Sequence, residues 1–125
     1  TITMTFWFHH YSAFQSTDHS GDFGVTATTD NNDASSGAIG FTSDTAGGAT
    51  IVYWTADDGS STASAVRINS SQQTSNAAKW RKATVDLSAM AGESSVYIYF
   101  FSATKATTYY WCNDTAIDSI KVVGS

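Results

Sequence analysis

Aromatic side chains near the end of the chain are the residues whose types and spacing best fit ligand binding. Tyr109 and Trp111 flank Tyr110, and they share one face if this segment is a strand, because alternate residues of a strand face the same side. Tyr97 and Tyr99 have the same spacing. Flat rings on an exposed face stack on sugar rings or anchor a protein partner. These two pairs are the predicted ligand-binding residues, and the alternative is that one face of each strand supports the core.

Two carboxylates, Asp114 and Asp118, flank the start of the last predicted strand. Carboxylate oxygens are ligands that Ca²⁺ prefers, and the ion takes about six to eight oxygens. The predicted cofactor is therefore a structural Ca²⁺ held by Asp114 and Asp118. The alternative is that Asp118 accepts hydrogen bonds from backbone amides and tightens a corner of the fold.

No pattern in the sequence indicates catalysis. The chain has no Gly-x-Ser-x-Gly elbow, no glycine-rich phosphate loop and no His-Glu-x-x-His signature. Glu93 is the only glutamate, and Cys112 has Asp114 nearby instead of the basic neighbours that activate a thiol. His9 and His10 are adjacent, so on a strand they point to opposite faces and cannot chelate one metal together. The sequence predicts that the chain is not an enzyme and that these histidines are structural.

Composition restricts the number of domains and the class of partner. The 125 residues suffice for one domain, residues 1–125, and not for two separate cores. Charged residues make up only 14% and the net charge is −5, which argues against a nucleic-acid partner because phosphate binding needs clustered Lys and Arg. No apolar run is long enough to insert across a membrane. The single cysteine excludes an internal disulfide.

Apolar residues alternate with polar ones along nearly the whole chain. The clearest alternating runs are Thr3–His9, Phe23–Thr28 and Val96–Phe101, and clusters of Gly, Ser, Asp and Asn separate such runs. No stretch has a helical stripe of apolar residues. The spacing of strands, about 8–12 residues, predicts an all-β fold, an antiparallel jelly-roll β-sandwich of about eight strands.

Five segments occur in the order found in MAM domains, which are jelly-roll sandwiches of adhesion receptors and secreted modules. The segments are Thr5–His9, Gly21–Val25, Tyr53-Trp54, Trp80–Leu87 and the Asp-Thr-Ala-Ile-Asp-Ser-Ile run from Asp114. The chain therefore resembles a MAM domain over most of its length. It lacks the disulfide cysteines of the family, which implies a bacterial or phage branch. The strand that opens the family's domain has no counterpart here.

The strongest strand motifs also predict core residues and an open sheet edge. Trp80 and the pair Ile117 and Ile120 are expected in the core. The chain begins inside a strand, so we expect a segment of a longer polypeptide and a first strand that lacks its partner. Copies of the chain or an upstream domain would cover that edge, which predicts a homo-oligomer or part of a larger chain.

The resemblance implies a non-catalytic adhesion or assembly module of an extracellular or viral appendage, such as a tail fibre or a surface adhesin. Its partners would be a glycan or neighbouring subunits, at the virion surface or outside the cell. The alternative is a carbohydrate-binding module of a secreted polysaccharide-degrading enzyme. A collagen-like or coiled-coil segment upstream would favour the first function, and a hydrolase domain upstream would favour the second.

Overall fold

Strands make up nearly all the regular structure that is described. The computed structural model describes residues 1–14, 17–18, 21, 23–29, 50–51, 54–56, 67–68, 71–102 and 114–125. Within them the only element that is not a strand is a turn of 3₁₀ helix, Ser88–Met90. The all-β prediction is thus confirmed for this part of the chain. None of the described residues forms a helix long and apolar enough to span a membrane.

One antiparallel sheet has β1 at its centre. The described strand order is β10-β1-β8-β6, with β10 at Thr115–Gly124, β1 at Ile2–His10, β8 at Arg81–Asp86 and β6 at Trp54–Ala56. β1 is therefore paired on both sides. The prediction that the first strand lacks a partner is wrong, because the last strand of the same chain returns beside it.

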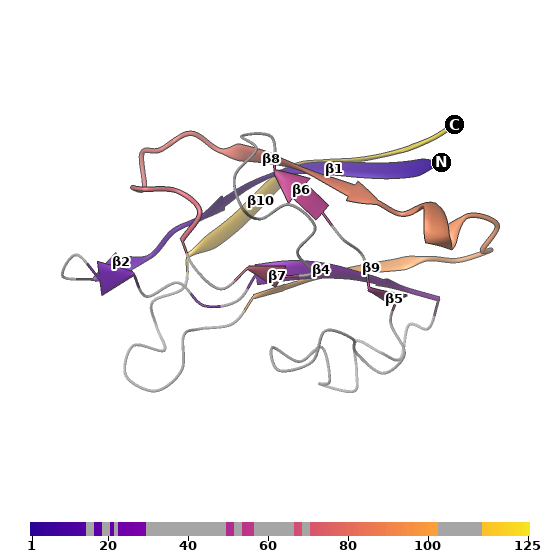
Figure 1. The fold of residues 1–125 in the computed structure, drawn as a ribbon, viewed down its shortest axis with the longest axis horizontal. Coiled ribbons are helices and arrows are strands. Elements are labelled where there is room, and N and C mark those ends of the chain that lie inside the picture. The colour runs from indigo at the N-terminus through magenta and orange to yellow at the C-terminus, as the bar shows by residue number, and fades with distance from the viewer. Residues whose placement is uncertain are drawn as a thin grey trace.

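The second antiparallel sheet is built around β4, Phe23–Thr28. β4 pairs along its whole length with β9, Tyr97–Ser102, and near its two ends with β5, Thr50–Ile51, and β7, Arg67–Ile68. A short separate hairpin joins β2, Ala13–Phe14, to β3, Thr17–Asp18. The two larger sheets lie in separate layers that face each other (Figure 1).

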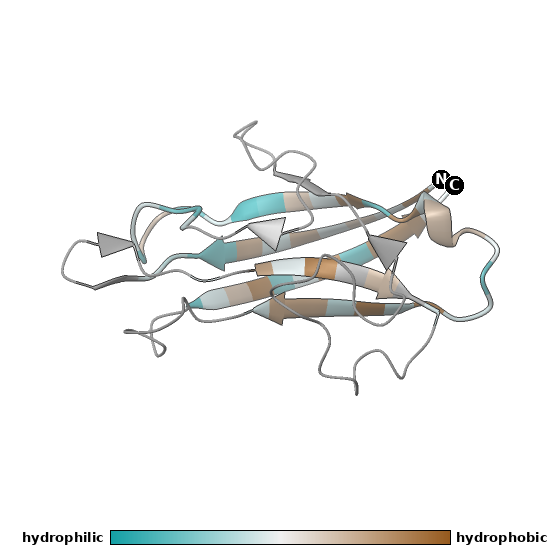
Figure 2. Cartoon of the chain, turned by 60° about the horizontal axis from the view of Figure 1, so that its bottom comes forward, coloured by the Kyte–Doolittle hydropathy of each residue, from teal (hydrophilic) through white to brown (hydrophobic). Residues whose placement is uncertain are grey.

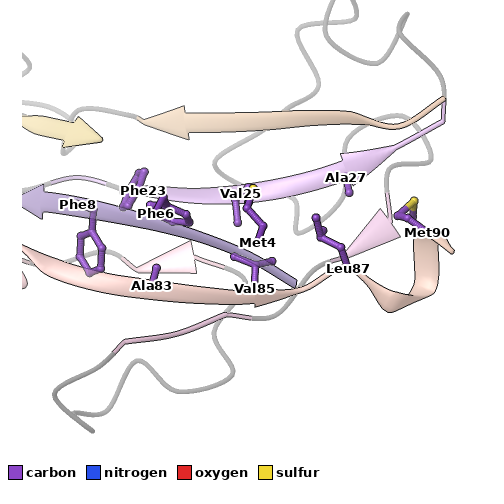
Figure 3. Close-up of a cluster of buried hydrophobic side chains, with 10 residues drawn as sticks. All are labelled: Met4, Phe6, Phe8, Phe23, Val25, Ala27, Ala83, Val85, Leu87 and Met90. Carbon is purple, nitrogen blue, oxygen red and sulfur yellow. The ribbon is translucent and has the colours of Figure 1, made fainter. Parts of the chain in front are cut away.

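The core fills the space between these layers. Figure 2 shows bands of apolar and polar residues along the strands, as expected where one face of each sheet is buried. Phe6 of β1 meets Phe23 of β4 with ring centroids 6.2 Å apart, and Phe100 of β9 at 5.1 Å, both edge to face. The central cluster comprises Met4, Phe6, Phe8, Phe23, Val25, Ala27, Ala83, Val85, Leu87 and Met90 (Figure 3).

The core prediction is wrong for Trp80, which is 41% exposed. β8 begins one residue later, and its inward-facing residues are Arg81, Ala83 and Val85. Because successive residues of a strand alternate between faces, Trp80 has the parity of the outward-facing Lys82. The indole therefore lies on the outer surface of the first sheet.

A β-bulge interrupts the pairing of β10 with β1. Asp118 pairs with Trp7 and Lys121 pairs with Thr5. Two residues of β10, Ser119 and Ile120, therefore lie opposite the single residue Phe6. Ser119 has a φ of 55°, the left-handed conformation found at one type of bulge. The extra residue brings Asp118 and Lys121 to the same face of the sheet.

The two predicted core residues of β10, Ile117 and Ile120, lie in different environments on either side of the start of this bulge. Ile117, before the bulge, packs against the core cluster as expected. Ile120, within the bulge, is 51% exposed, and Val122 beyond it is 54% exposed. The prediction is wrong for Ile120, because β10 is the outermost described strand of its sheet and the bulge shifts the strand relative to the core.

Candidate functional site

The outer surface of the first sheet carries two exposed indole rings. Trp7 and Trp80 are 38% and 41% exposed. Trp7 lies directly opposite Lys82 of β8, and the ring of Trp80 lies beside the ring of His9, which is two positions after Trp7 in β1. The two indoles therefore occupy neighbouring positions on one face of the sheet.

His9 supports the indole of Trp80. The two rings lie 6.0 Å apart between centroids, with an interplanar angle of 53°. His9 is itself buried, and its Nε2 lies 3.2 Å from the carbonyl oxygen of Ser75. Trp80 is thus packed on one side and open to solvent on the other.

Charged and hydroxyl side chains surround the indoles. Trp7 lies between Asp118 of β10 and Lys82 of β8, each directly opposite it in the ladder. Asp118 is exposed and Lys82 is half-buried. Thr84, two residues from Lys82 in β8, is also exposed on this surface. We refer to Trp7, Trp80, Lys82 and Asp118 as the Trp face.

A shallow groove of about 410 Å³ continues from the Trp face along the segment that precedes β8. Its lining includes Gln72, Thr74, Lys79 and Trp80. Amide, hydroxyl and ammonium groups therefore stand next to an aromatic ring. Such a combination provides both stacking and directed hydrogen bonds, which is typical of sites for small polar ligands.

Gln73 fixes this segment to β1. Its Oε1 accepts a hydrogen bond from the amide of His10 at 2.8 Å, and its Nε2 donates to the carbonyl of Phe8 at 3.1 Å. The amide of Gln72 donates to the carbonyl of His10 at 2.8 Å, and Arg81 Nη1 donates to Gln72 Oε1 at 2.8 Å. At the end of β1, beyond its pairing with β8, the side chain of Gln73 thus makes the backbone hydrogen bonds that a neighbouring strand would otherwise make.

His10 occupies the opposite face of β1 from His9, as predicted, and is fully buried. Its Nδ1 lies 2.7 Å from Thr115 Oγ1 and its Nε2 lies 2.8 Å from the carbonyl oxygen of Gly21. Because a carbonyl only accepts hydrogen bonds, Nε2 is a donor. Thr115 Oγ1 also lies 3.0 Å from Ser102 Oγ. These contacts tie β1, β10 and β9 together, which is a structural role.

The predicted tyrosine pair shares one face of β9. Tyr97 and Tyr99 point away from the core, on the side opposite Phe100. Tyr97 is 37% exposed and Tyr99 is half-buried. The other predicted pair, Tyr109 and Trp111, lies outside the described residues. The tyrosines of β9 are on the second sheet, so they form a surface distinct from the Trp face.

The two predicted calcium ligands are both exposed but lie far apart along β10. Asp114 and Asp118 are four residue steps apart, so their Cα atoms lie roughly 13 Å from each other in an extended strand, whereas each oxygen ligand of Ca²⁺ lies about 2.3–2.6 Å from the ion. Asp118 Oδ1 instead accepts a hydrogen bond from the amide of Ser119 at 2.6 Å. The described residues contain no group of three or more His, Cys, Asp or Glu that could hold a metal ion. The calcium site stays a prediction.

Compared with protein-family models, curated proteins and solved structures, the chain matches none of them. The MAM resemblance therefore rests on its five sequence segments. Sequence reasoning missed the Trp face as a binding candidate. The outward position of Trp7 was visible in its alternation with Phe6 and Phe8, but no signal indicated that Trp80 would join it on the same face.

Proposed function

We propose that the chain is a non-catalytic adhesion module, with a MAM-like jelly-roll fold, that binds a glycan through the Trp face. The observation that carries this proposal is the exposure of Trp7 and Trp80 on the outer surface of the first sheet, beside Lys82 and Asp118. Exposed aromatic rings gathered at one place are typical of interaction sites. The apolar C–H face of a sugar ring covers an indole, and its hydroxyl groups remain free for hydrogen bonds.

The polar members of the Trp face supply those hydrogen bonds. Lys82 donates and Asp118 accepts, so sugar hydroxyl groups lying over Trp7 meet both kinds of partner. The neighbouring positions of the two indoles suit adjacent units of an oligosaccharide. The groove beside Trp80 extends the surface with Gln72 and Lys79, where a further unit would lie.

The proposed setting is an extracellular or virion surface, as part of a tail fibre or a surface adhesin. The supporting feature is the composition, in which charged residues are scarce at 14% and hydroxyl and amide side chains are abundant. A shallow face binds one sugar segment weakly. Repetition of the module along an appendage would raise the effective affinity without any new contact.

The same exposed indoles also favour the second candidate function, a carbohydrate-binding module of a secreted polysaccharide-degrading enzyme. The two functions differ in ligand. An adhesin binds the branched glycans of a cell surface, whereas such a module binds the repeating polymer that its enzyme degrades.

A glycan array together with pull-down on insoluble cellulose, xylan and chitin tests both functions. We expect the wild-type chain to bind one of these ligand sets. Trp7→Ala and Trp80→Ala should each lower the affinity about tenfold or more, as expected for aromatic residues central to a site. Tyr97→Ala, which removes an equally exposed ring from the other sheet, is the matched control and should bind as the wild type does.

Two outcomes would contradict the proposal. Absence of binding to every glycan and polysaccharide would exclude a glycan-binding role. Binding that is lost in Tyr97→Ala but kept in both tryptophan variants would move the site to the tyrosine pair of β9.

A further inference from the structure

β10 presents a long strand edge on the first sheet. The strand has ten residues and, among the residues that the structure describes, it pairs only with β1. Ile120, Val122 and Val123 are each about half exposed. Natural proteins usually shorten or interrupt such edges, because an open row of backbone N–H and C=O groups pairs readily with another strand. We propose that β10 pairs antiparallel with β10 of a second copy of this chain, joining the two sheets into one.

The contacts of Ser125 show which residues of β10 after the bulge point their backbone N–H and C=O groups towards β1 and which point them away. Ser125 donates its amide to the carbonyl of Thr1 at 2.9 Å, and the backbone nitrogen of Thr1 donates to the carbonyl of Ser125 at 3.0 Å. Ser125 therefore turns both backbone groups towards β1. Because these groups alternate in direction along a strand, Gly124 and Val122 turn theirs away from β1.

The contact of Asp114 gives the same information for the backbone groups of the β10 residues before the bulge. The carbonyl of Asp114 accepts a hydrogen bond from the amide of Tyr11 at 3.1 Å, so Asp114 turns this group towards β1. Because the direction alternates from residue to residue, Thr115, the next residue, turns its backbone groups to the side away from β1. Thr115 and Ile117 therefore turn their backbone groups away from β1, as Val122 and Gly124 do.

These outward-turned residues are arranged symmetrically about the bulge. A two-fold axis between Ser119 and Ile120 places Val122 opposite Ile117 of the second copy, and Gly124 opposite Thr115 of the second copy. In both pairs the backbone groups of the two residues point at each other. This register also overlaps the whole length of both strands, which any shifted register would shorten.

Charge favours the same register. In a regular strand two residues three positions apart face opposite sides, but the bulge places Asp118 and Lys121 on one side, opposite Trp7 and Thr5. About the proposed axis, Asp118 lies opposite Lys121 of the second copy, and Lys121 opposite Asp118 of the second copy. Two opposite-charge pairs form and no like charges meet. Self-pairing in this register therefore matches the charges of this chain.

The pairing also has a consequence for ligand binding. The axis is perpendicular to the sheet, so both outer surfaces stay on the same side of the joined sheet. The two Trp faces would then point in one direction, which allows both to contact one glycan-covered surface. The pairing itself does not depend on a glycan.

Sedimentation velocity of the full chain, from micromolar to millimolar concentration, tests the proposal. We expect a reversible monomer–dimer equilibrium. Asp118→Lys and Lys121→Asp should each weaken it about tenfold or more, because each replaces two attractive cross-strand pairs with two repulsive ones. The double variant, D118K with K121D, should restore the wild-type equilibrium. Glu93→Lys, an equal charge change at an exposed residue away from β10, should leave it unchanged.

Val122→Lys provides an independent variant. Val122 is already half exposed, and its backbone groups turn away from β1, so the ladder with β1 is kept. In the proposed register a lysine at position 122 faces Ile117 of the second copy, with no carboxylate opposite it as Lys121 has, so it opposes strand pairing, and this variant should be monomeric. A wild-type chain that stays monomeric at every concentration would overturn the proposal. So would a dimer that Asp118→Lys leaves intact, or single variants that the double variant fails to rescue.

Discussion

The centroid of the His9 imidazole ring lies 6.0 Å from the centroid of the Trp80 indole ring. Both rings are on the outer surface of the first sheet, and His9 is held there by its contact with Ser75. A surface tryptophan is therefore supported by a fixed neighbour and not by the core. This arrangement separates the contribution of Trp80 to binding from its contribution to stability.

Trp80→Ala should lower the free energy of unfolding by no more than about 1 kcal/mol, because the ring is 41% exposed and its removal leaves no buried cavity. Urea denaturation measures this, and we expect a midpoint close to that of the wild type. A loss of about 3 kcal/mol or more, the usual cost of truncating a core aromatic residue, would return Trp80 to the core.

Phe6→Ala should instead lower the free energy of unfolding by about 3–5 kcal/mol. The ring of Phe6 is fully buried and contacts rings from β1, β4 and β9, so its loss opens a cavity between the sheets. Trp7→Ala is the matched control, because Trp7 is the next residue of the same strand and faces outward. Equal losses in the two variants would contradict the assignment of faces in β1.

The alternation that the sequence shows in β1 and β4 matches the alternation of buried and outward-facing residues in β1. Met4, Phe6 and Phe8 face inward, as the period of two predicts. Trp80 was assigned to the core from its place in a strand motif, and that assignment was wrong. The inward row of β8 starts with a charged residue, Arg81, whose guanidinium lies 5.6 Å from the ring centroid of Phe8. An inward-facing arginine hides the alternation of apolar and polar residues that would have indicated which way the neighbouring tryptophan faces.

The central position of β1 could not be predicted from local sequence. Its partner on one side is β10, at the far end of the chain, and an alternating pattern states which face is buried but not which strand lies alongside. The bulge at Ser119 had no signal either, because glycine, the usual residue for a positive φ, is absent there. The surface of β10 therefore became visible only in the structure.

Gln73→Ala should lower the free energy of unfolding by about 1–3 kcal/mol, because it removes the hydrogen-bond partners that the side chain gives to the His10 amide and the Phe8 carbonyl. Amide hydrogen exchange at His10 should accelerate. Gln73→Glu keeps the acceptor for His10 and loses only the donor to Phe8. It should therefore slow exchange at His10 relative to Gln73→Ala, and equal rates would contradict the assigned contact.

Acid should destabilise the fold partly through Asp86. A hydrogen bond from the Ser88 hydroxyl, and then one from the Ser88 amide at 2.9 Å, lowers the pKa of the Asp86 carboxyl. A lowered pKa means that this contribution to stability is present above the unfolded-state pKa of about 3.9 and is lost as the pH falls through the folded-state pKa.

The expected result is a smaller fall in melting temperature below about pH 4 for Asp86→Asn than for the wild type. Ser88→Ala removes the hydroxyl donor and should reduce the fall in the same direction. Melting curves followed by circular dichroism across this range measure it. Identical slopes in the wild type and both variants would show that Asp86 contributes nothing to the acid response.

Ser119 provides a direct test of the bulge. Its φ of 55° suits glycine, whereas a β-branched residue is strongly disfavoured in the left-handed region. Ser119→Val should therefore lower the free energy of unfolding by about 1–2 kcal/mol, and Ser119→Gly should change it by less than about 0.5 kcal/mol. Urea denaturation of both variants measures the difference. If the two variants were equally stable, β10 would pass Ser119 without a bulge, Asp118 and Lys121 would face opposite sides, and the charge-paired register of the proposed dimer would be lost.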